Sequence, residues 1–178
     1  MLDGEEGQGG RAVQFQATHT YQRPAAEVLA VLTDFDRVRE KYEALGHRNI
    51  ELVTRDETAD GGITLVLRRV VPLELPGFAK KVLSPRQAVT QTDTWSASGD
   101  DGTRTGTFEV VARGTPVRVR GTMRLTSDGK RGCTEVIDVT VDCSVPLIGG
   151  KIAGLVAETT RRVIDHEFTW TSDLLGTR

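Results

Sequence analysis

The middle of this 178-residue chain is a series of strand-like runs joined mostly by short turns. Apolar and polar residues alternate in these runs, and a period of two is typical of a half-buried strand. Short links between consecutive strands favour hairpins, so the series predicts an antiparallel meander. The six runs span Arg48–Glu57, Gly62–Val71, Gln87–Ala97, Arg104–Arg113, Val117–Ser127 and Cys133–Val145.

One strand and two short helices are predicted before this series. Ala12–Tyr21 alternates as a strand. Pro24 suits the first turn of a helix over Ala25–Leu32, since the missing N–H costs nothing there. Asp34 can cap a second helix that Gly46 ends.

A long helix over about Leu147–Leu174 is predicted to close the chain. At 1.5 Å per residue it is roughly 40 Å long, enough to cover a whole sheet. We therefore expect an α+β fold, with a curved seven-stranded antiparallel sheet around this helix. One link of the meander, Pro72–Leu83, is too long and apolar for a hairpin, and it predicts a short amphipathic helix beginning near Gly77.

Composition and cysteine spacing exclude several classes. Lys plus Arg number 23 and Asp plus Glu number 25, a balance that does not favour a nucleic-acid partner. Cys133 and Cys143 lie in one predicted strand, roughly 33 Å apart, so they suit a reduced, cytoplasmic protein better than a disulfide. No apolar run reaches 18 residues, so no membrane-spanning helix is expected. The Gly- and Glu-rich residues 1–11 are expected to form a disordered tail, and 12–176 a single domain.

Motifs for metal or nucleophile chemistry are missing from the sequence. The three histidines are far apart, and no HExxH, CxxC, GxSxG or phosphate-loop spacing occurs. We therefore assign no catalytic residue, metal or cofactor.

A few polar residues fall on inward positions of apolar faces, where unpaired burial is costly. His19, Arg69 and Glu135 could bind a ligand head group, or they could pair with one another or lie at wet sheet ends, which we favour. His19, Tyr21 and Glu135 are also the candidates for acid–base chemistry. On one outward face, Arg118, Arg120 and Arg124 could meet a membrane or RNA; we favour pairing with Glu109, Asp138 and Asp142 on neighbouring strands.

The element order resembles the START-like (SRPBCC) helix-grip superfamily. The stretches Leu75–Leu83, Thr92–Trp95 and Val145–Ile152 look like an uncharacterised bacterial branch that carries a domain-of-unknown-function label. The resemblance implies a cavity between the sheet and the long helix that holds a lipid, isoprenoid or polyketide-like molecule, with Leu75, Phe78 and Val82 in a lid.

The residues expected to line that cavity alternate inward on the strands or face the sheet from the helix. They are Phe15, His19, Leu65, Leu67, Trp95, Phe108, Val110, Met123, Ile152, Val156 and Val163. The alternative is that the same residues make a filled core.

Three functions follow from these expectations. The first is binding or transport of a hydrophobic small molecule, with transient membrane contact through Phe78, Lys80 and Lys81 at the lid. The second is a polyketide-cyclase-like enzyme with an acid or base in the cavity. The third is a protein-interaction module with a filled core. The sequence predicts no oligomeric state.

Overall fold

The computed structural model describes residues 12–129 and 131–176 of the chain. The expected tail, 1–11, lies outside the described residues. The elements are, in order, β1 (Val13–Tyr21), α1 (Ala25–Thr33), α2 (Phe35–Ala44), β2 (Arg48–Glu57), β3 (Ile63–Pro72), β4 (Arg86–Trp95), β5 (Arg104–Ala112), β6 (Val117–Ser127), β7 (Cys133–Cys143) and α3 (Gly149–Gly176).

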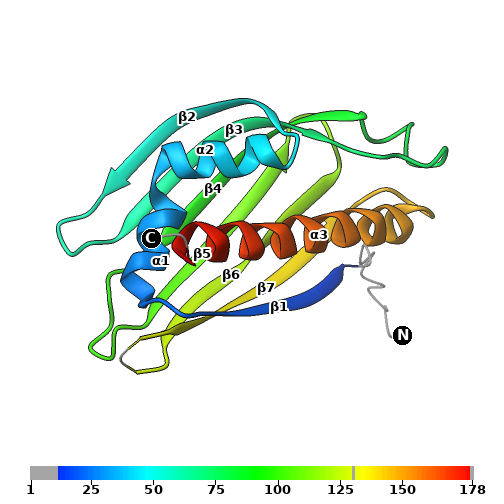
Figure 1. Ribbon diagram of the computed structural model, residues 1–178. Coiled ribbons are helices and arrows are strands. Elements are labelled where there is room, and N and C mark those ends of the chain that lie inside the picture. Colours follow the sequence, from blue (N-terminus) through cyan, green and yellow to red (C-terminus); the bar gives the residue numbers. More distant parts are fainter. Residues whose placement is uncertain (1–11, 130, 177–178) are drawn as a thin grey trace, which may run out of the picture.

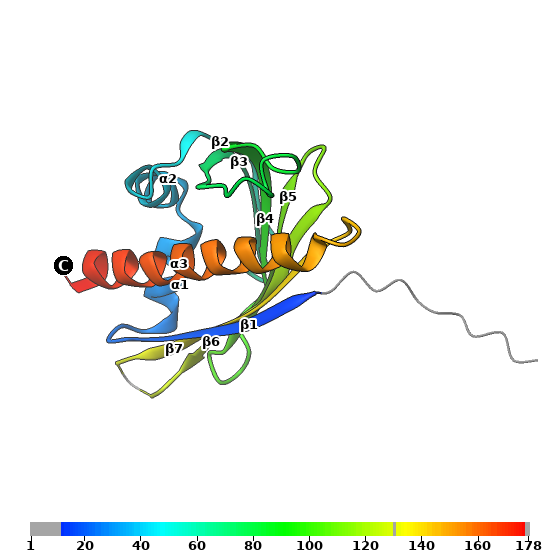
Figure 2. The ribbon, with the colours of Figure 1, turned by 90° about the vertical axis from the view of Figure 1, so that its right-hand side faces the viewer.

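The strands form one antiparallel sheet in the order β1-β7-β6-β5-β4-β3-β2. Consecutive strands β2 to β7 are neighbours, which confirms the predicted meander, and β1 is added beside β7. Figure 1 shows α3 crossing one face of this sheet, and Figure 2 shows the sheet curving around the helix. The fold is therefore the predicted α+β helix-grip architecture.

The turn between α1 and α2 follows the predicted capping chemistry. The side chain of Asp34 accepts a hydrogen bond from the backbone N–H of Arg37 at 3.0 Å, which satisfies one free donor of the first turn of α2. Gly46 then adopts a φ of +82°, a left-handed conformation that glycine tolerates best. These two residues set the direction in which the chain enters β2.

The link between β3 and β4 corrects one prediction. No helix forms near Gly77; residues 77–82 make successive turns instead. Only the bond from Leu83 N to Ala79 O, at 2.8 Å, has the spacing of an α-helical turn. Prolines at both ends leave too few residues for a longer helix. The segment is held down because Ala79 and Leu83 are buried.

Two helices cover different strands on the inner face of the sheet. α3 packs against β1 and β7, and α2 packs against β2. We call β1, β7 and the α3 face that packs on them the closed side. We call the inner face of β3–β5, together with the α3 face turned toward it, the open side. Because the sheet is strongly curved, one helix on the closed side cannot also fill the open side.

Candidate functional site

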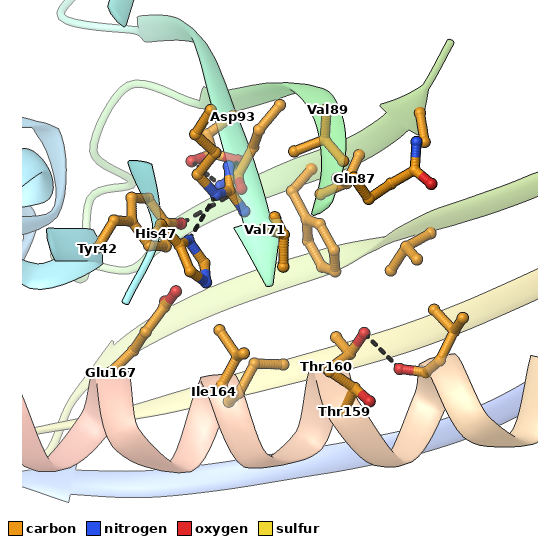
Figure 3. Close-up of a pocket in the computed structure, with 18 of the residues that line it drawn as sticks. Tyr42, His47, Val71, Gln87, Val89, Asp93, Thr159, Thr160, Ile164 and Glu167 are labelled. Atoms are coloured by element: carbon orange, nitrogen blue, oxygen red, sulfur yellow. Dashed lines mark hydrogen bonds between the residues drawn. The ribbon is translucent and has the colours of Figure 1, made fainter. Parts of the chain in front are cut away.

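A cavity of about 180 Å³ lies between α3 and the inner face of the sheet. One water needs only roughly 10–15 Å³ by the same kind of measure, so a larger molecule has room here. Figure 3 shows Val89 and Asp93 on the sheet side facing Ile164 and Glu167 on α3. Most of the wall is apolar, and the charged side chains gather at one end, away from Gln87, Thr159 and Thr160.

Six of the eleven residues expected to line the cavity lie on its wall. They are Trp95, Phe108, Val110, Met123, Val156 and Val163. Four of them come from β4, β5 and β6, where strict alternation sends every second residue inward. Whether they bind a ligand remains a prediction.

The other five face inward but lie where helices have filled the space. Leu65 and Leu67 pack beneath α2 in a cluster with Val38. Ile152 is fully buried in the main core. None of these three is among the cavity-lining residues.

Phe15 and His19 on β1 are covered from the closed side. The Arg161 guanidinium lies 4.4 Å from the Phe15 ring centroid. His19 stacks on Phe168 at 5.0 Å and hydrogen-bonds the Ser172 hydroxyl at 2.7 Å, both on α3. Burial lowers the pKa of His19, which favours its neutral form. A role for His19 in binding or catalysis in the cavity has no support from this position.

The predicted lid segment does reach the cavity, through other residues than those expected. Leu73 and Leu83 line the wall. Leu75 and Val82 pack against the main core beside them, half-buried. Phe78 points outward and is 41% exposed.

The polar end of the cavity begins with an ion pair between two helices. Lys41 of α2 is buried, and its Nζ lies 3.2 Å from a carboxylate oxygen of Glu167 on α3. Burial acts to lower the pKa of Lys41, but the charge and hydrogen bond of Glu167 and other nearby groups raise it overall. The lysine is therefore charged and already partnered.

A chain of hydrogen bonds next to this pair connects α2 to β4. The Tyr42 hydroxyl donates to Gln91 Oε1 at 3.2 Å, and Gln91 Nε2 donates to both carboxylate oxygens of Asp93, at 2.9 and 2.8 Å. Burial raises the pKa of Asp93 to about 6, against the lowering effect of the Gln91 bond, Lys41 and Arg69. Part of the Asp93 surface faces the cavity, which is why its side chain is only half-buried.

Arg69 of β3 is the second buried cation of the site, and contacts with His47 and Tyr42 fix its position. Its Nε donates to His47 Nδ1 at 3.1 Å, and its guanidinium carbon lies 4.1 Å from the Tyr42 ring centroid. Its Nη1 is buried and, among the described residues, has no hydrogen-bond partner. Burial, with the charges of Arg69 and Lys41, lowers the pKa of His47 to about 3, so this imidazole is neutral.

Glu135 is a second buried carboxyl on the cavity wall, nearer the closed side. It accepts a hydrogen bond from the Tyr21 hydroxyl at 2.9 Å. Burial raises the pKa of Glu135 to about 7, although the Tyr21 bond acts against this. The pKa of Tyr21 is raised, chiefly by burial and also by Glu135. Glu135, His19 and Arg69 thus do not pair with one another, contrary to what the sequence had suggested: Glu135 binds Tyr21, His19 binds Ser172 and Arg69 binds His47.

Sequence analysis missed Lys41, His47, Asp93 and Glu167 as site residues. Some of them carried a signal. Lys41 follows Val38 by three residues and precedes Leu45 by four, which places it on the apolar face of its helix. Asp93 is two residues from Trp95 on the inward face of β4. His47 follows the end of α2, where no periodicity applies.

The outer face of the sheet carries two ion pairs of the expected kind, and Asp138 accepts a hydrogen bond from Gln16 instead of an arginine. Arg118 pairs with Glu109 at 3.2 Å, and Arg120 pairs with Asp142. Within residues 12–129 and 131–176, no group of three His, Cys, Asp or Glu side chains could hold a metal ion. No helix in the same ranges is long and apolar enough to cross a membrane.

Solved structures with the same architecture are similar to this chain at low identity. A protein of Thermus thermophilus, TTHA0849, matches with a TM-score of 0.61 and 15% identity, covering 90% of this chain and 95% of its own. The Zhui aromatase/cyclase of a Streptomyces species matches with a TM-score of 0.59 and 14% identity, over 92% and 93%. Human STARD10 matches with a TM-score of 0.59 and 13% identity, over 89% and 62%. These likenesses establish a START-like fold.

A search of curated proteins finds no significant match. One family model, described as a protein of unknown function (DUF2505), matches residues 16–175. That range covers most of β1, all of β2 to β7 and nearly all of α3, so the chain belongs to the DUF2505 family.

Proposed function

We propose that this protein binds and carries a hydrophobic small molecule, of a lipid, isoprenoid or polyketide-like class, in the cavity between α3 and the sheet. The observation that carries the proposal is the unfilled, mostly apolar space on the open side. Concave apolar pockets with a few polar groups are the usual sites for small ligands. An interaction module with a filled core would not leave this space. The pair of buried free cysteines also fits a reducing, cytoplasmic compartment.

The test uses a neutral, polarity-sensitive dye, N-phenyl-1-naphthylamine, and two variants of adjacent residues. Val110 lines the cavity, whereas Val111 lies on the outer face and is 36% exposed. We expect saturable dye binding by the wild-type protein, binding at least about tenfold weaker in Val110→Phe, and unchanged binding in Val111→Phe. Val156→Phe, which fills the cavity from α3, should repeat the effect if Val110→Phe folds poorly. Absence of saturable binding, or equal binding by the filled variants, would refute the proposal.

An enzyme is the second candidate, because one observation favours it. The Glu135 carboxyl faces the cavity with a pKa near neutrality, which suits a general acid or base. The matched aromatase/cyclase shares the fold at 14% identity. Turnover of an aromatic polyketide analogue that is lost in Glu135→Gln, with analogue binding retained, would favour the enzyme over the carrier.

We also infer that the segment between β3 and β4 is where the ligand enters, and that it touches anionic membranes. Leu73 and Leu83 line the cavity, while Phe78 projects outward beside the exposed Lys80 and Lys81. Basic residues next to an exposed aromatic favour the surface of an anionic bilayer. Phe78→Asp should reduce co-sedimentation with phosphatidylserine vesicles, and equal co-sedimentation would refute this inference.

A further inference from the structure

The polar end of the cavity contains a buried cation that the protein itself does not satisfy. Arg69 is 6% exposed, and its Nη1 has no hydrogen-bond partner among the described residues. A guanidinium stays charged at any ordinary pH. A buried donor without a partner costs free energy, so its persistence indicates that a partner is supplied from outside the chain.

The nearby carboxylates are engaged elsewhere. Glu167 pairs with Lys41, and Asp93 accepts both of its short hydrogen bonds from Gln91. Among the described residues no ion pair reaches Arg69, although the charge of Arg69 does act to lower the pKa of Asp93. The Arg69 guanidinium therefore lies near these carboxylates without forming an ion pair with either of them.

His47 supplies a second donor beside the first. Its Nδ1 accepts from Arg69 Nε at 3.1 Å, and the ring is neutral, so the remaining hydrogen is on Nε2. No hydrogen bond from the described residues reaches Nε2, and His47 lines the cavity. In Figure 3 one nitrogen of the labelled His47 ring is joined to the guanidinium, and the other points toward the space in front of α3.

Both donors are fixed in place before any ligand arrives. Tyr42 stacks on the His47 ring, with centroids 5.1 Å apart and planes 9° from parallel, and it also lies under the Arg69 guanidinium. Gln91 holds the Tyr42 hydroxyl in turn. A preorganised pair of N–H donors loses little conformational entropy when it binds an acceptor.

We propose that the ligand is an amphipathic carboxylic acid whose carboxylate binds the Arg69 guanidinium and His47 Nε2. This inference rests on the proposed function and names the head group of its ligand. A planar carboxylate matches the planar guanidinium, and its second oxygen can accept from His47 Nε2. A phosphate would bring more negative charge next to Asp93 and Glu167. The apolar part of the acid lies along the wall that Val110 and Val156 form.

The test measures displacement of N-phenyl-1-naphthylamine by decanoic acid and by 1-decanol, at about pH 7.5, where the acid is ionised. The two competitors have the same chain length and differ in the head group. We expect the wild-type protein to bind the acid at least about tenfold more tightly than the alcohol, since a charge-assisted hydrogen bond is roughly twice as strong as a neutral one. Arg69→Met should remove this preference, because it weakens binding of the acid by at least about tenfold and binding of the dye and the alcohol much less.

Arg68→Met is the matched control, because Arg68 is the preceding residue on β3 and is exposed. It should keep the preference for the acid. An equal loss in Arg68→Met would overturn the proposal by showing that bulk charge, and not the buried guanidinium, selects the acid.

Equal affinity of the wild-type protein for acid and alcohol would also overturn it, while leaving the cavity proposal intact. This comparison needs no variant, so poor folding of Arg69→Met would not prevent a decision. If the dye itself does not bind, the proposed function fails, and the inference fails with it.

Discussion

The closed and open sides of this molecule share one sheet and one helix, yet they differ in how their inward polar groups are hydrogen-bonded. On the closed side, inward polar groups find partners within the chain: Tyr21 binds Glu135, and His19 binds Ser172. On the open side the guanidinium of Arg69 keeps a buried N–H that no described residue binds. Within the described residues the Thr171 hydroxyl on α3 is also buried without a partner, but it is neutral and costs less to bury.

The difference teaches that the position of the helices, and not the pattern of the strands, decides where a ligand can bind. Strands on both sides alternate in the same way, and both send apolar residues inward. α3 covers β1 and β7, and α2 covers β2 and the part of β3 around Leu65 and Leu67, so the rest of the inner face between the helices borders the cavity. Four experiments test this difference between the two sides.

The largest effect is expected from shortening two isoleucines of α3. Ile152 is fully buried and does not line the cavity, whereas Ile164 is buried but lies on the cavity wall. Ile152→Ala should lower the free energy of unfolding by about 4 kcal/mol, through lost transfer energy and a new cavity. Ile164→Ala should cost about half as much, because it enlarges an existing space. Chemical denaturation measures both, and equal losses would contradict the distinction between the two sides.

Removing the two cations of the polar end should have unequal effects. Lys41→Met leaves the half-buried Glu167 without its partner, and we expect a loss of about 2–3 kcal/mol of stability. Arg69→Met removes an unsatisfied donor together with its contacts to His47 and Tyr42, so the change should stay within about 1 kcal/mol. If thermal and denaturant unfolding show Arg69→Met to be the more damaging change, Arg69 is a structural residue and not a ligand-binding one.

The Glu135 carboxyl should make stability depend on pH. Its pKa is about 7 in the folded protein, against an ordinary 4.5. Below pH 4.5 both states are protonated; above it the unfolded state ionises first, so the wild-type protein loses stability until the pH passes about 7. The loss is on the order of 3 kcal/mol. Glu135→Gln cannot titrate, so its stability relative to wild type should rise over this range. Parallel pH profiles for the two proteins would show that the folded pKa of Glu135 is not raised.

The smallest effect is expected on the outer face, which serves as a baseline for the other variants. Arg120 and Asp142 form an exposed ion pair there. Arg120→Ala should change the free energy of unfolding by about 0.5 kcal/mol or less, because water and salt screen such pairs. A larger loss, measured by denaturation at low and high salt, would mean that ion pairs on the outer face also contribute to the stability of the fold.

The sequence is sufficient to predict most of the fold. The bounds of β2 and β6 agree with the predicted runs. In β6 the reason is that turn residues at both ends interrupt a clear period of two. The cap at Asp34 follows from local chemistry. The helix expected near Gly77 was wrong because a short apolar segment between prolines has the composition of a helix without the length for one.

The candidate site was only half predictable, for a physical reason. Alternation shows that Leu65 and Val110 both face inward, but α2 covers Leu65 and nothing covers Val110. Which inward residue meets a helix depends on how separate elements pack, and no local pattern records it. The same holds for Lys41 and Glu167, which are 126 positions apart and meet only in the folded chain.

The most direct test of the account is a methyl-group NMR titration of the wild-type protein with decanoic acid. The account predicts saturable shifts for the methyl groups of Val110, Met123 and Ile164 on the cavity wall, while those of Val139 and Ile152 in the packed core stay in place. Shifts confined to exposed methyls, or spread equally over both groups, would contradict the claim that the open side is a preformed binding site.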